Sequence, residues 1–161
     1  IIDLSELLRG LLRREGTRVP LSEEIAFLQR YLNLMLLRYE DKLQITWRRS
    51  PTAEEAIVPH NFLQPVVENA LTHGYGGSEC VMELFIETAV EDGRAVVSIR
   101  DKGCGMDEEL LQAFRQDLPS DAVHGLGMVK RKLTGTFGRD FSFTIQSEKG
   151  KGTCCRFCFP L

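Results

Sequence analysis

The stretch "VVENALTHG", residues 66–74, places a carboxylate, an amide and an imidazole in an otherwise apolar run. Glu68 and Asn69 are adjacent, and His73 follows Asn69 by four residues, so Asn69 and His73 share one face of a helix. A neutral amide oxygen is a ligand for Mg²⁺ that leaves the metal able to bridge to phosphate oxygens. We therefore interpret the run as a helix that lines a nucleotide site with its polar side and joins the core with its apolar side.

Three further stretches combine glycine with groups that suit a nucleotide: "DKGCG" at 101–105, "HGLG" at 124–127 and "GKGT" at 150–153. Asp101 ends a predicted strand, where a lone carboxylate can accept a hydrogen bond from an exocyclic amine. The glycines that follow it let the backbone approach a flat ring without a clash from Cβ. Gly125 and Gly127 open a predicted helix, and helix N-termini present free N–H groups to phosphate.

Each of these motifs has a simpler interpretation when taken alone. A DxGxG segment is commonly a tight turn, and a histidine on an apolar helix is commonly a structural residue with satisfied hydrogen bonds. The "HGLG" segment lacks the preceding strand and the full glycine pattern of a dinucleotide-binding fingerprint. The order and spacing of the motifs together, rather than any one motif, indicate a nucleotide site.

The hydrophobic pattern predicts the elements that position these motifs. Leucines recur with helical spacing over 4–12, and a second apolar stripe runs from Ile25 to Tyr39 after a predicted N-cap at Ser22. Further helices are expected over 61–72, 108–114 and 128–136, and strands over 42–48, 81–90, 94–101, 141–148 and 153–159. Because strand hairpins alternate with helices, we expect an α+β fold with a mixed sheet, helices layered on one face, and an N-terminal helical arm.

The size and composition are those of an ordinary globular protein. A chain of 161 residues with 43% hydrophobic and 27% charged residues accommodates one domain, or one domain and a helical arm. The net charge of −3 and the lack of a long basic run argue against nucleic acid as a partner. No apolar stretch approaches the ~20 residues of a membrane span, so we expect no membrane contact by this fragment. The start at Ile1, within a predicted helix, indicates a piece of a longer protein.

The five cysteines raise the alternative of a metal site or a disulfide. Cys155 and Cys158 form a CxxC pair within a predicted strand, where residues three apart point to opposite faces. The two thiols therefore cannot share one ion, and we interpret the cysteines as small core residues in a reducing compartment.

The order of the motifs resembles that of the GHKL, or Bergerat-fold, ATP-binding domain. An N-box "QPVVENALTHG", a G1 box "DKGCGM", a variable lid, a glycine box "HGLG" and "GKGT" follow one another as in that superfamily. The N-terminal part is similar to LytS-type sensor histidine kinases in "LSELLR" (4–9), "VPLSEEI" (19–25) and "YLNLMLLRYEDKL" (31–43). The resemblance covers nearly the whole chain, and it implies an α/β sandwich that binds ATP and Mg²⁺.

The resemblance assigns roles to the residues around the base and the metal. It implies that Asn69 coordinates Mg²⁺, that Asp101 binds the adenine amine and that Thr153 supports the base. It also implies that Gly103 and Gly105 shape the wall against which adenine lies.

The remaining predicted residues concern the phosphates and the reaction. The resemblance implies that Gly125 and Gly127 cradle phosphate, and that residues 106–124 form a lid that closes on the nucleotide. Glu68, Asn69 and His73 belong to the N-box and are expected to take part in catalysis.

By the same resemblance, the chain is expected to be the catalytic domain of a two-component histidine kinase. Such an enzyme moves the γ-phosphate of ATP to a histidine and then to an aspartate of a response regulator, its expected partner. The family's phosphoacceptor stretch lies upstream of the first helix and does not occur in this sequence, so the acceptor is expected outside the fragment. His60, in "VPHNFLQP", is an alternative acceptor, but we interpret it as a structural residue.

The implied organisation is a remnant of a dimerisation helix at 1–16 and the ATP-binding catalytic domain at 17–161. We expect the full-length protein to form a homodimer through that helix, while the leucine stripe has the alternative of docking on the domain itself. The expected location is cytoplasmic, with the parent protein anchored in the bacterial inner membrane.

Two departures from the family pattern leave alternatives open. Pro65 stands where ATP-hydrolysing members carry a glutamate one turn before the asparagine, which disfavours activation of water. An ungapped count back from "KRKL" makes Gly125 the second glycine of its box, with Val123 replacing the first and Met128 replacing an asparagine. That reading favours a degenerate module that binds nucleotide or scaffolds a partner. A serine kinase or ATPase of the anti-sigma type is disfavoured by Pro65 and by the LytS-like first 43 residues.

Overall fold

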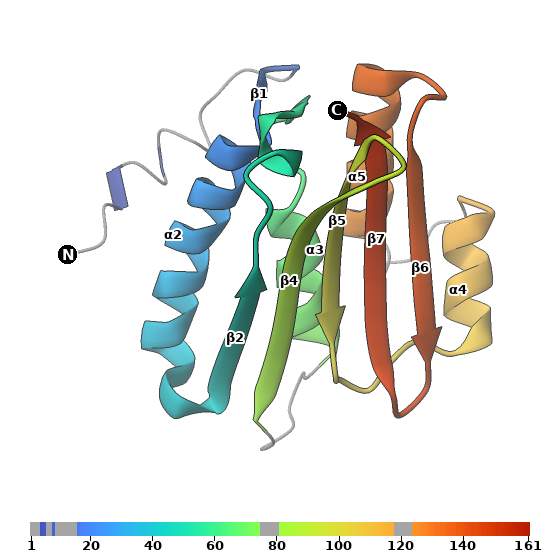
Figure 1. Cartoon of the computed structure of the whole chain (residues 1–161). Helices are drawn as coiled ribbons and strands as arrows, with labels where there is room; N and C mark the ends of the chain where they lie inside the picture. Colours follow the sequence, from blue (N-terminus) through green and yellow to red (C-terminus); the bar gives the residue numbers. More distant parts are fainter. Residues whose placement is uncertain (1–3, 6–7, 9–15, 75–80, 118–123) are drawn as a thin grey trace.

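Five strands form a mixed sheet in the computed structural model, which describes residues 4, 5, 8, 16–74, 81–117 and 124–161. In spatial order they are β2 (Leu43–Arg48), β4 (Met82–Glu91), β5 (Arg94–Asp101), β7 (Gly152–Pro160) and β6 (Ser142–Glu148). β2 runs parallel to β4, and the other neighbours are antiparallel. Helices cover one face of this sheet (Figure 1). The predicted α+β fold is therefore confirmed.

The covering helices are α2 (Leu21–Tyr39), α3 (Gln64–Asn69), α4 (Glu108–Arg115) and α5 (His124–Phe137). Period-two alternation turns every second strand side chain toward them. Leu84 and Ile86 of β4 are buried on this face beside their β5 partners Asp101 and Ile99. Phe62, in the segment before α3, packs edge-on against Phe157 of β7 with ring centroids 5.4 Å apart. The core thus lies between the sheet and the helix layer.

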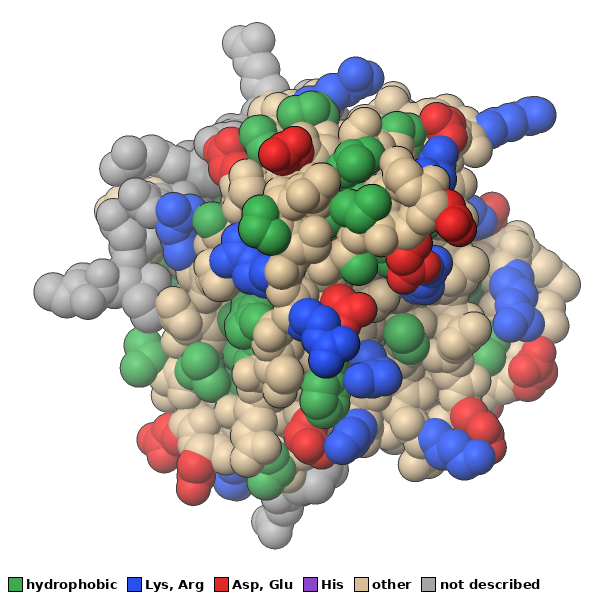
Figure 2. All heavy atoms as spheres, viewed as in Figure 1, with side chains coloured by type: hydrophobic (Ala, Val, Ile, Leu, Met, Phe, Trp, Pro, Cys, Tyr) green, Lys and Arg blue, Asp and Glu red, His purple; other side chains and the backbone are tan. Residues whose placement is uncertain are grey.

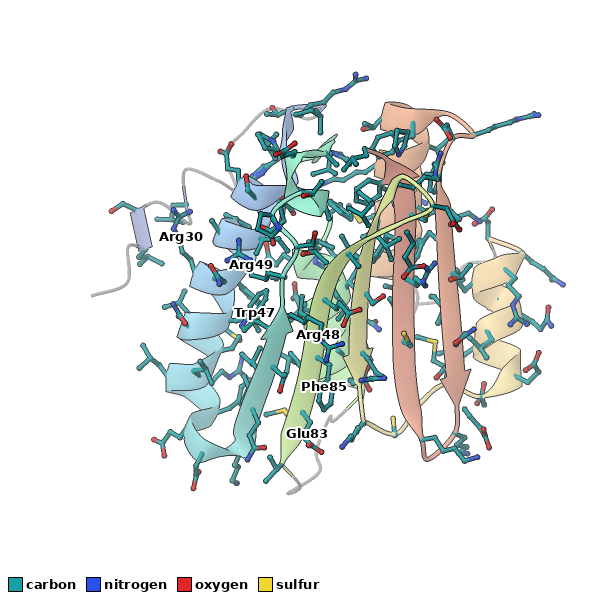
Figure 3. The ribbon with its side chains drawn as sticks, viewed as in Figure 1. Arg30, Trp47, Arg48, Arg49, Glu83 and Phe85 are labelled. Carbon is teal, nitrogen blue, oxygen red and sulfur yellow. The ribbon has the colours of Figure 1, made fainter. Side chains whose placement is uncertain are left out.

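The opposite face of the sheet carries charged side chains of both signs (Figure 2). Arg48 of β2 lies 3.4 Å from Glu87 of β4. The guanidinium carbon of Arg100, in β5, lies 4.9 Å from the centroid of the Phe85 ring. Arg48 and Phe85 are labelled in Figure 3, as is Trp47, which lines a groove between β2 and α2. This polar face explains why the sheet is covered on one side only.

The CxxC pair of β7 divides between the two faces, as predicted. Cys155 is buried on the helix side, where burial raises its pKa well above the usual range. Cys154 and Cys158 are half-buried on the open face, and Cys104 is exposed. The interpretation as core residues therefore holds for Cys155 alone among the four cysteines in the described ranges, and those ranges contain no cluster of metal ligands.

The start of α2 differs from the prediction. Pro20 is the capping residue and makes no side-chain cap bond, so the predicted N-cap at Ser22 is wrong. The first helical residue, Leu21, donates its N–H to the Ala56 carbonyl at 2.7 Å, so tertiary contact replaces a side-chain cap. Pro20 also ends β1 (Arg18–Pro20), which pairs antiparallel with β3 (Ile57–Pro59) in a two-stranded sheet that the sequence did not predict.

Two other helices begin elsewhere than predicted. α3 begins at Gln64 rather than 61 and continues as a wider π-helical turn over Ala70–Gly74, and α5 begins at His124 rather than 128. Of the predicted helix at 4–12, Leu4, Ser5 and Leu8 are helical and the other positions lie outside the described residues. No helix within the described ranges is long and apolar enough to cross a bilayer.

A buried carboxylate of α2 explains the late start of α3. Glu24 is 0% exposed and accepts the backbone N–H groups of Asn61 and Leu63, at 2.8 and 3.3 Å. Asn61 has a left-handed φ of 58°, so the chain turns here before it enters the helix. His60 Nδ1 lies 3.3 Å from Glu24 Oε2, and the ring of Phe27 packs against the imidazole at 5.2 Å. This enclosed environment supports the structural interpretation of His60.

We expect Glu24→Gln to lower the free energy of unfolding by about 1–3 kcal/mol, because an amide supplies one acceptor oxygen where two buried N–H groups need acceptors. Chemical denaturation measures the change. Ser22→Ala is the matched control in the same helical turn and is expected to cost less than about 0.5 kcal/mol. If Ser22→Ala lowered the free energy of unfolding by ~1 kcal/mol, Ser22 would act as the helix cap after all.

Candidate functional site

A cleft of about 260 Å³ opens at the end of the sheet where β5 finishes and the β6–β7 turn begins. Five of the nine predicted site residues line it, namely Asn69, His73, Asp101, Gly105 and Thr153. The other lining residues come from the π-helical turn, the loop after β5, the start of α4 and the β6–β7 turn: Ala70, Cys104, Met106, Asp107, Leu110 and Lys149. The structure therefore brings together three of the four sequence motifs.

The stretch 66–74 is divided between the core and the cleft. Val66 and Val67 are buried in the core, while Asn69 and His73 line the cleft and His73 is exposed. The π-helical turn begins directly after Asn69, and such turns are frequent at functional sites. Asn69 thus stands at the last residue of α3, with its amide half-buried at the edge of the cavity.

Glu68 is exposed and does not line the cleft. Burial, followed by the nearby negative charge of Glu68, raises the pKa of Tyr31 in α2 to about 12. Glu68 is therefore close enough to α2 to act on the Tyr31 phenol, on a different side of α3 from Asn69.

Asp101 is the last residue of β5 and is 6% exposed. Its carboxylate accepts the Gly103 N–H at 2.8 Å and also a backbone hydrogen bond from Thr153. Burial raises the pKa of Asp101, and the two hydrogen bonds oppose that shift only in part. A buried carboxylate that reaches a cleft is suited to a ligand that donates hydrogen bonds, such as an amine.

The loop after β5 lies directly against the β6–β7 turn. A Cβ on Gly105 would come within 2.1 Å of the Glu148 carbonyl oxygen. A Cβ on Gly152 would come within 2.2 Å of the backbone carbonyl oxygen of Asp101. Both glycines have left-handed φ angles, of 70° and 93°. The Gly150 N–H donates to the Cys104 carbonyl at 2.6 Å, which closes the contact. These glycines are needed for close backbone packing that shapes the cleft wall.

Ser147 of β6 contacts two residues of this wall from behind, and the sequence did not predict it. Its hydroxyl accepts the Met106 N–H at 2.7 Å and lies 2.7 Å from the Thr153 hydroxyl. A signal was available, because Ser147 falls in phase with Phe143 and Ile145, whose side chains face the helices. A serine at a core-facing position indicates a hydrogen-bonding role.

Gly125 and Gly127 lie in the first turn of α5, as predicted, but they are not among the residues that line the cleft. A Cβ on Gly125 would meet nothing within 4 Å, so the described part of the protein leaves open space there. Val123 lies outside the described residues, so the two readings of the glycine box stay open. Of the predicted lid at 106–124, the structure describes 106–117 and 124, including α4, whose first turn is capped by Asp107 through the Leu110 N–H at 2.9 Å.

Two solved structures that superpose on this chain are domains of histidine kinases. The histidine kinase domain of a blue-light activated kinase from Erythrobacter litoralis superposes with a TM-score of 0.63 at 17% identity, covering 98% of this chain and 69% of that chain. The nucleotide-free catalytic domain of histidine kinase ThkA superposes with a TM-score of 0.62 at 16% identity. The alignment covers 91% of this chain and 96% of that chain. At these identities the likeness establishes the fold.

The chain belongs to the histidine kinase-, DNA gyrase B- and HSP90-like ATPase family, which it matches over residues 55–161. Residues 1–43 match a second family, described as histidine kinase. The sensor protein kinase HptS of Staphylococcus aureus is 28% identical over 162 aligned residues, which cover 98% of this chain. The chain spans about a third of the length of that relative, 31%.

We expect Gly152→Ala to destabilise the protein by more than about 2 kcal/mol, because a Cβ meets the Asp101 carbonyl and the backbone is strained at positive φ. Gly150→Ala is the matched control, since Gly150 lies in the same turn with φ of 84° and open space around it. Gly150→Ala is expected to lower the free energy of unfolding only by the backbone strain of a non-glycine residue at positive φ, about 1 kcal/mol. Thermal and chemical unfolding measure the stability of both variants. If both lose the same stability, the contact between a Cβ at position 152 and the Asp101 carbonyl is not the cause.

Proposed function

We propose that this chain is the ATP-binding catalytic part of a sensor histidine kinase of the LytS type. The observation that carries the proposal is the cleft in which the buried Asp101 carboxylate and the Asn69 amide both open onto one cavity. Membership of the ATPase family supports ATP as the ligand, and the match of residues 1–43 supports a kinase. The LytS assignment rests on the motifs of the N-terminal 43 residues.

The proposed position of the nucleotide follows from the donors and acceptors of the cleft. Asp101 accepts from the adenine amine, with Thr153 beside it and the loop at Gly103 and Gly105 against the ring. The phosphates extend toward α5, where Gly125 and Gly127 leave the backbone accessible at a helix N-terminus. The segment 106–124 closes over the bound nucleotide as a lid.

The residues of the cleft fit Mg²⁺ that arrives with the nucleotide rather than a site built by protein alone. Asn69 supplies one amide oxygen, and the described residues contain no cluster of His, Cys, Asp and Glu that would hold an ion. Mg²⁺ commonly uses one or two protein ligands together with substrate phosphates and water. Bound there, the metal would neutralise charge on the transferring phosphate.

The proposed reaction is transfer of the γ-phosphate to a histidine outside this fragment. The bond from the γ-phosphorus to the bridging oxygen breaks, a phosphorus–nitrogen bond forms on the imidazole, and ADP leaves. The phosphoryl group then passes to an aspartate of a response regulator. Pro65, in the first turn of α3, has no proton acceptor, so water is not activated as a competing nucleophile. We propose roles for Glu68 and His73 in this step on the N-box match alone; His73 lines the cleft, whereas Glu68 does not.

The proposed organisation keeps residues 1–16 as part of a dimerisation helix and 17–161 as the catalytic domain. Leu4 and Leu8 are 58% and 50% exposed, which suits a helix that pairs with a second copy in the longer protein. We further propose that the parent protein is anchored in the bacterial inner membrane with this part on the cytoplasmic side, where ATP and response regulators occur.

A second candidate function is a module that binds nucleotide or scaffolds a partner without kinase activity. The observation that favours it is that Gly125 and Gly127 do not reach the cleft. Phosphotransfer from ATP to a supplied histidine-containing dimerisation fragment distinguishes the two functions, since the scaffold transfers nothing.

We expect Asn69→Asp to weaken binding of Mg-ATP by about ten- to hundredfold, the range found when a group that orients a metal site is altered. The added carboxylate repels the triphosphate, while the fold stays intact. Asn33→Asp on the exposed face of α2 adds the same charge away from the cleft and serves as the control. Titration calorimetry with and without Mg²⁺ measures both, and unchanged affinity in Asn69→Asp would remove Asn69 from the metal site.

Asp101→Asn should reduce the preference for adenine over guanine nucleotides, because an amide can also donate to the guanine oxygen. We expect the ratio of ATP to GTP affinity to fall by about tenfold, the equivalent of one hydrogen bond to a charged group. Competition of both nucleotides against a fluorescent ATP analogue gives the ratio. The same preference before and after the substitution would exclude Asp101 from base recognition.

A further inference from the structure

The Ser147 hydroxyl is surrounded by three polar groups at hydrogen-bonding distance. The Met106 N–H donates to it at 2.7 Å, the Gly152 carbonyl lies 2.9 Å away as an acceptor, and the Thr153 hydroxyl lies 2.7 Å away. These neighbours come from the loop that enters the lid and from two consecutive positions of β7. Ser147 therefore joins the cleft wall to the residue beside the buried Asp101.

Counting protons fixes the direction of these hydrogen bonds. A serine hydroxyl has one proton and two lone pairs. All three contacts are made at once only if Ser147 donates to the Gly152 carbonyl and accepts from both the Met106 N–H and the Thr153 hydroxyl. In the other arrangement, Ser147 donates to Thr153 and the contact with Gly152 is lost. The complete arrangement turns the Thr153 proton away from the cleft, toward Ser147.

The cleft consequently presents acceptors to the edge of a bound base. Thr153 and Asp101 both line the cavity. With its proton directed at Ser147, the Thr153 hydroxyl has only lone pairs to offer a ligand, and the Asp101 carboxylate likewise only accepts. At position 6 of a purine, an exocyclic amine can donate to these acceptors, whereas a keto oxygen would face two acceptors.

We propose that Ser147 is a specificity-determining positioning residue, which holds the Thr153 hydroxyl as an acceptor and so favours 6-amino over 6-keto purine nucleotides. The inference rests on the proposed function, because it requires a purine at Asp101. Ser147 acts through Thr153 and does not itself touch the base. It is also absent from the residues that line the cleft, in agreement with this indirect role.

The test compares ATP with ITP, which differ in the amine or keto group at one ring position. In Ser147→Ala, the Thr153 proton is free to point into the cleft. We therefore expect the ratio of ATP affinity to ITP affinity to fall by about three- to tenfold. Thr153→Val should narrow the ratio similarly, and adding Ser147→Ala to Thr153→Val should change it no further. Thr144→Ala, which removes an exposed hydroxyl from the other face of β6, is the control and should leave the ratio unchanged.

Titration calorimetry of the 161-residue chain with Mg-ATP and Mg-ITP separates the outcomes. A purely structural Ser147 would weaken both nucleotides equally in Ser147→Ala and leave the ratio unchanged, which would overturn the inference while leaving the proposed function in place. Further narrowing by Ser147→Ala in the Thr153→Val background would also overturn it. If Ser147→Ala does not fold, Thr153→Val alone decides, and an unchanged ratio refutes the acceptor role. No ATP binding by the unmutated chain would overturn the proposed function itself.

Discussion

The contact between the loop after β5 and the β6–β7 turn is the constraint on which the cleft depends. Two backbone segments far apart in the sequence approach so closely that no side chain fits at Gly105 or Gly152. This approach buries Asp101 at the end of β5 and brings the Thr153 N–H to its carboxylate. Burial of a carboxylate is costly unless it is hydrogen-bonded. The same packing thus makes the Asp101 carboxylate a buried acceptor that favours a ligand with hydrogen-bond donors. It also supplies the backbone hydrogen bonds that offset the cost of burying that carboxylate.

The helix that carries Asn69 contributes to the core and the cleft in one short span. Val66 and Val67 bury one side, while Asn69 ends the regular helix at the point where the backbone widens into a π-helical turn. Because the core side is fixed by packing, the polar side is held at a defined position relative to Asp101. A site on a packed element of this kind is more precisely positioned than one on a free loop.

Much of the fold follows from local patterns in the sequence. Strands β4 and β5 were predicted from alternation, and Asp92 and Gly93, with φ of 49° and 73°, form the turn between them. α4 was placed within one residue, because its acidic first turn and apolar spacing are local signals. By contrast, β1 and β3 are three residues long, too short for a periodic signal, and are defined by pairing across the chain.

The sequence also indicated several residues that line the candidate cleft, because their motifs are local. The motifs located Asn69, Asp101 and Thr153 because their residue types and order are visible in the sequence. Ser147 and Glu24 escaped notice because their functions depend on distant partners: Ser147 contacts Met106, 41 positions away, and Glu24 contacts Asn61, 37 positions away. A single sequence does not show which polar residue will meet which backbone group after folding.

Glu24 of α2 ties that helix to the segment that leads into α3, the helix that carries Asn69. The carboxylate belongs to the segment that matches the histidine kinase family, and it holds the entry to the helix of the ATPase family match. If α2 slid along α3, the buried N–H groups of Asn61 and Leu63 would lose their acceptor, at a cost of several kcal/mol. We therefore expect a displacement of α2 to move the start of α3 with it, rather than to break these two hydrogen bonds.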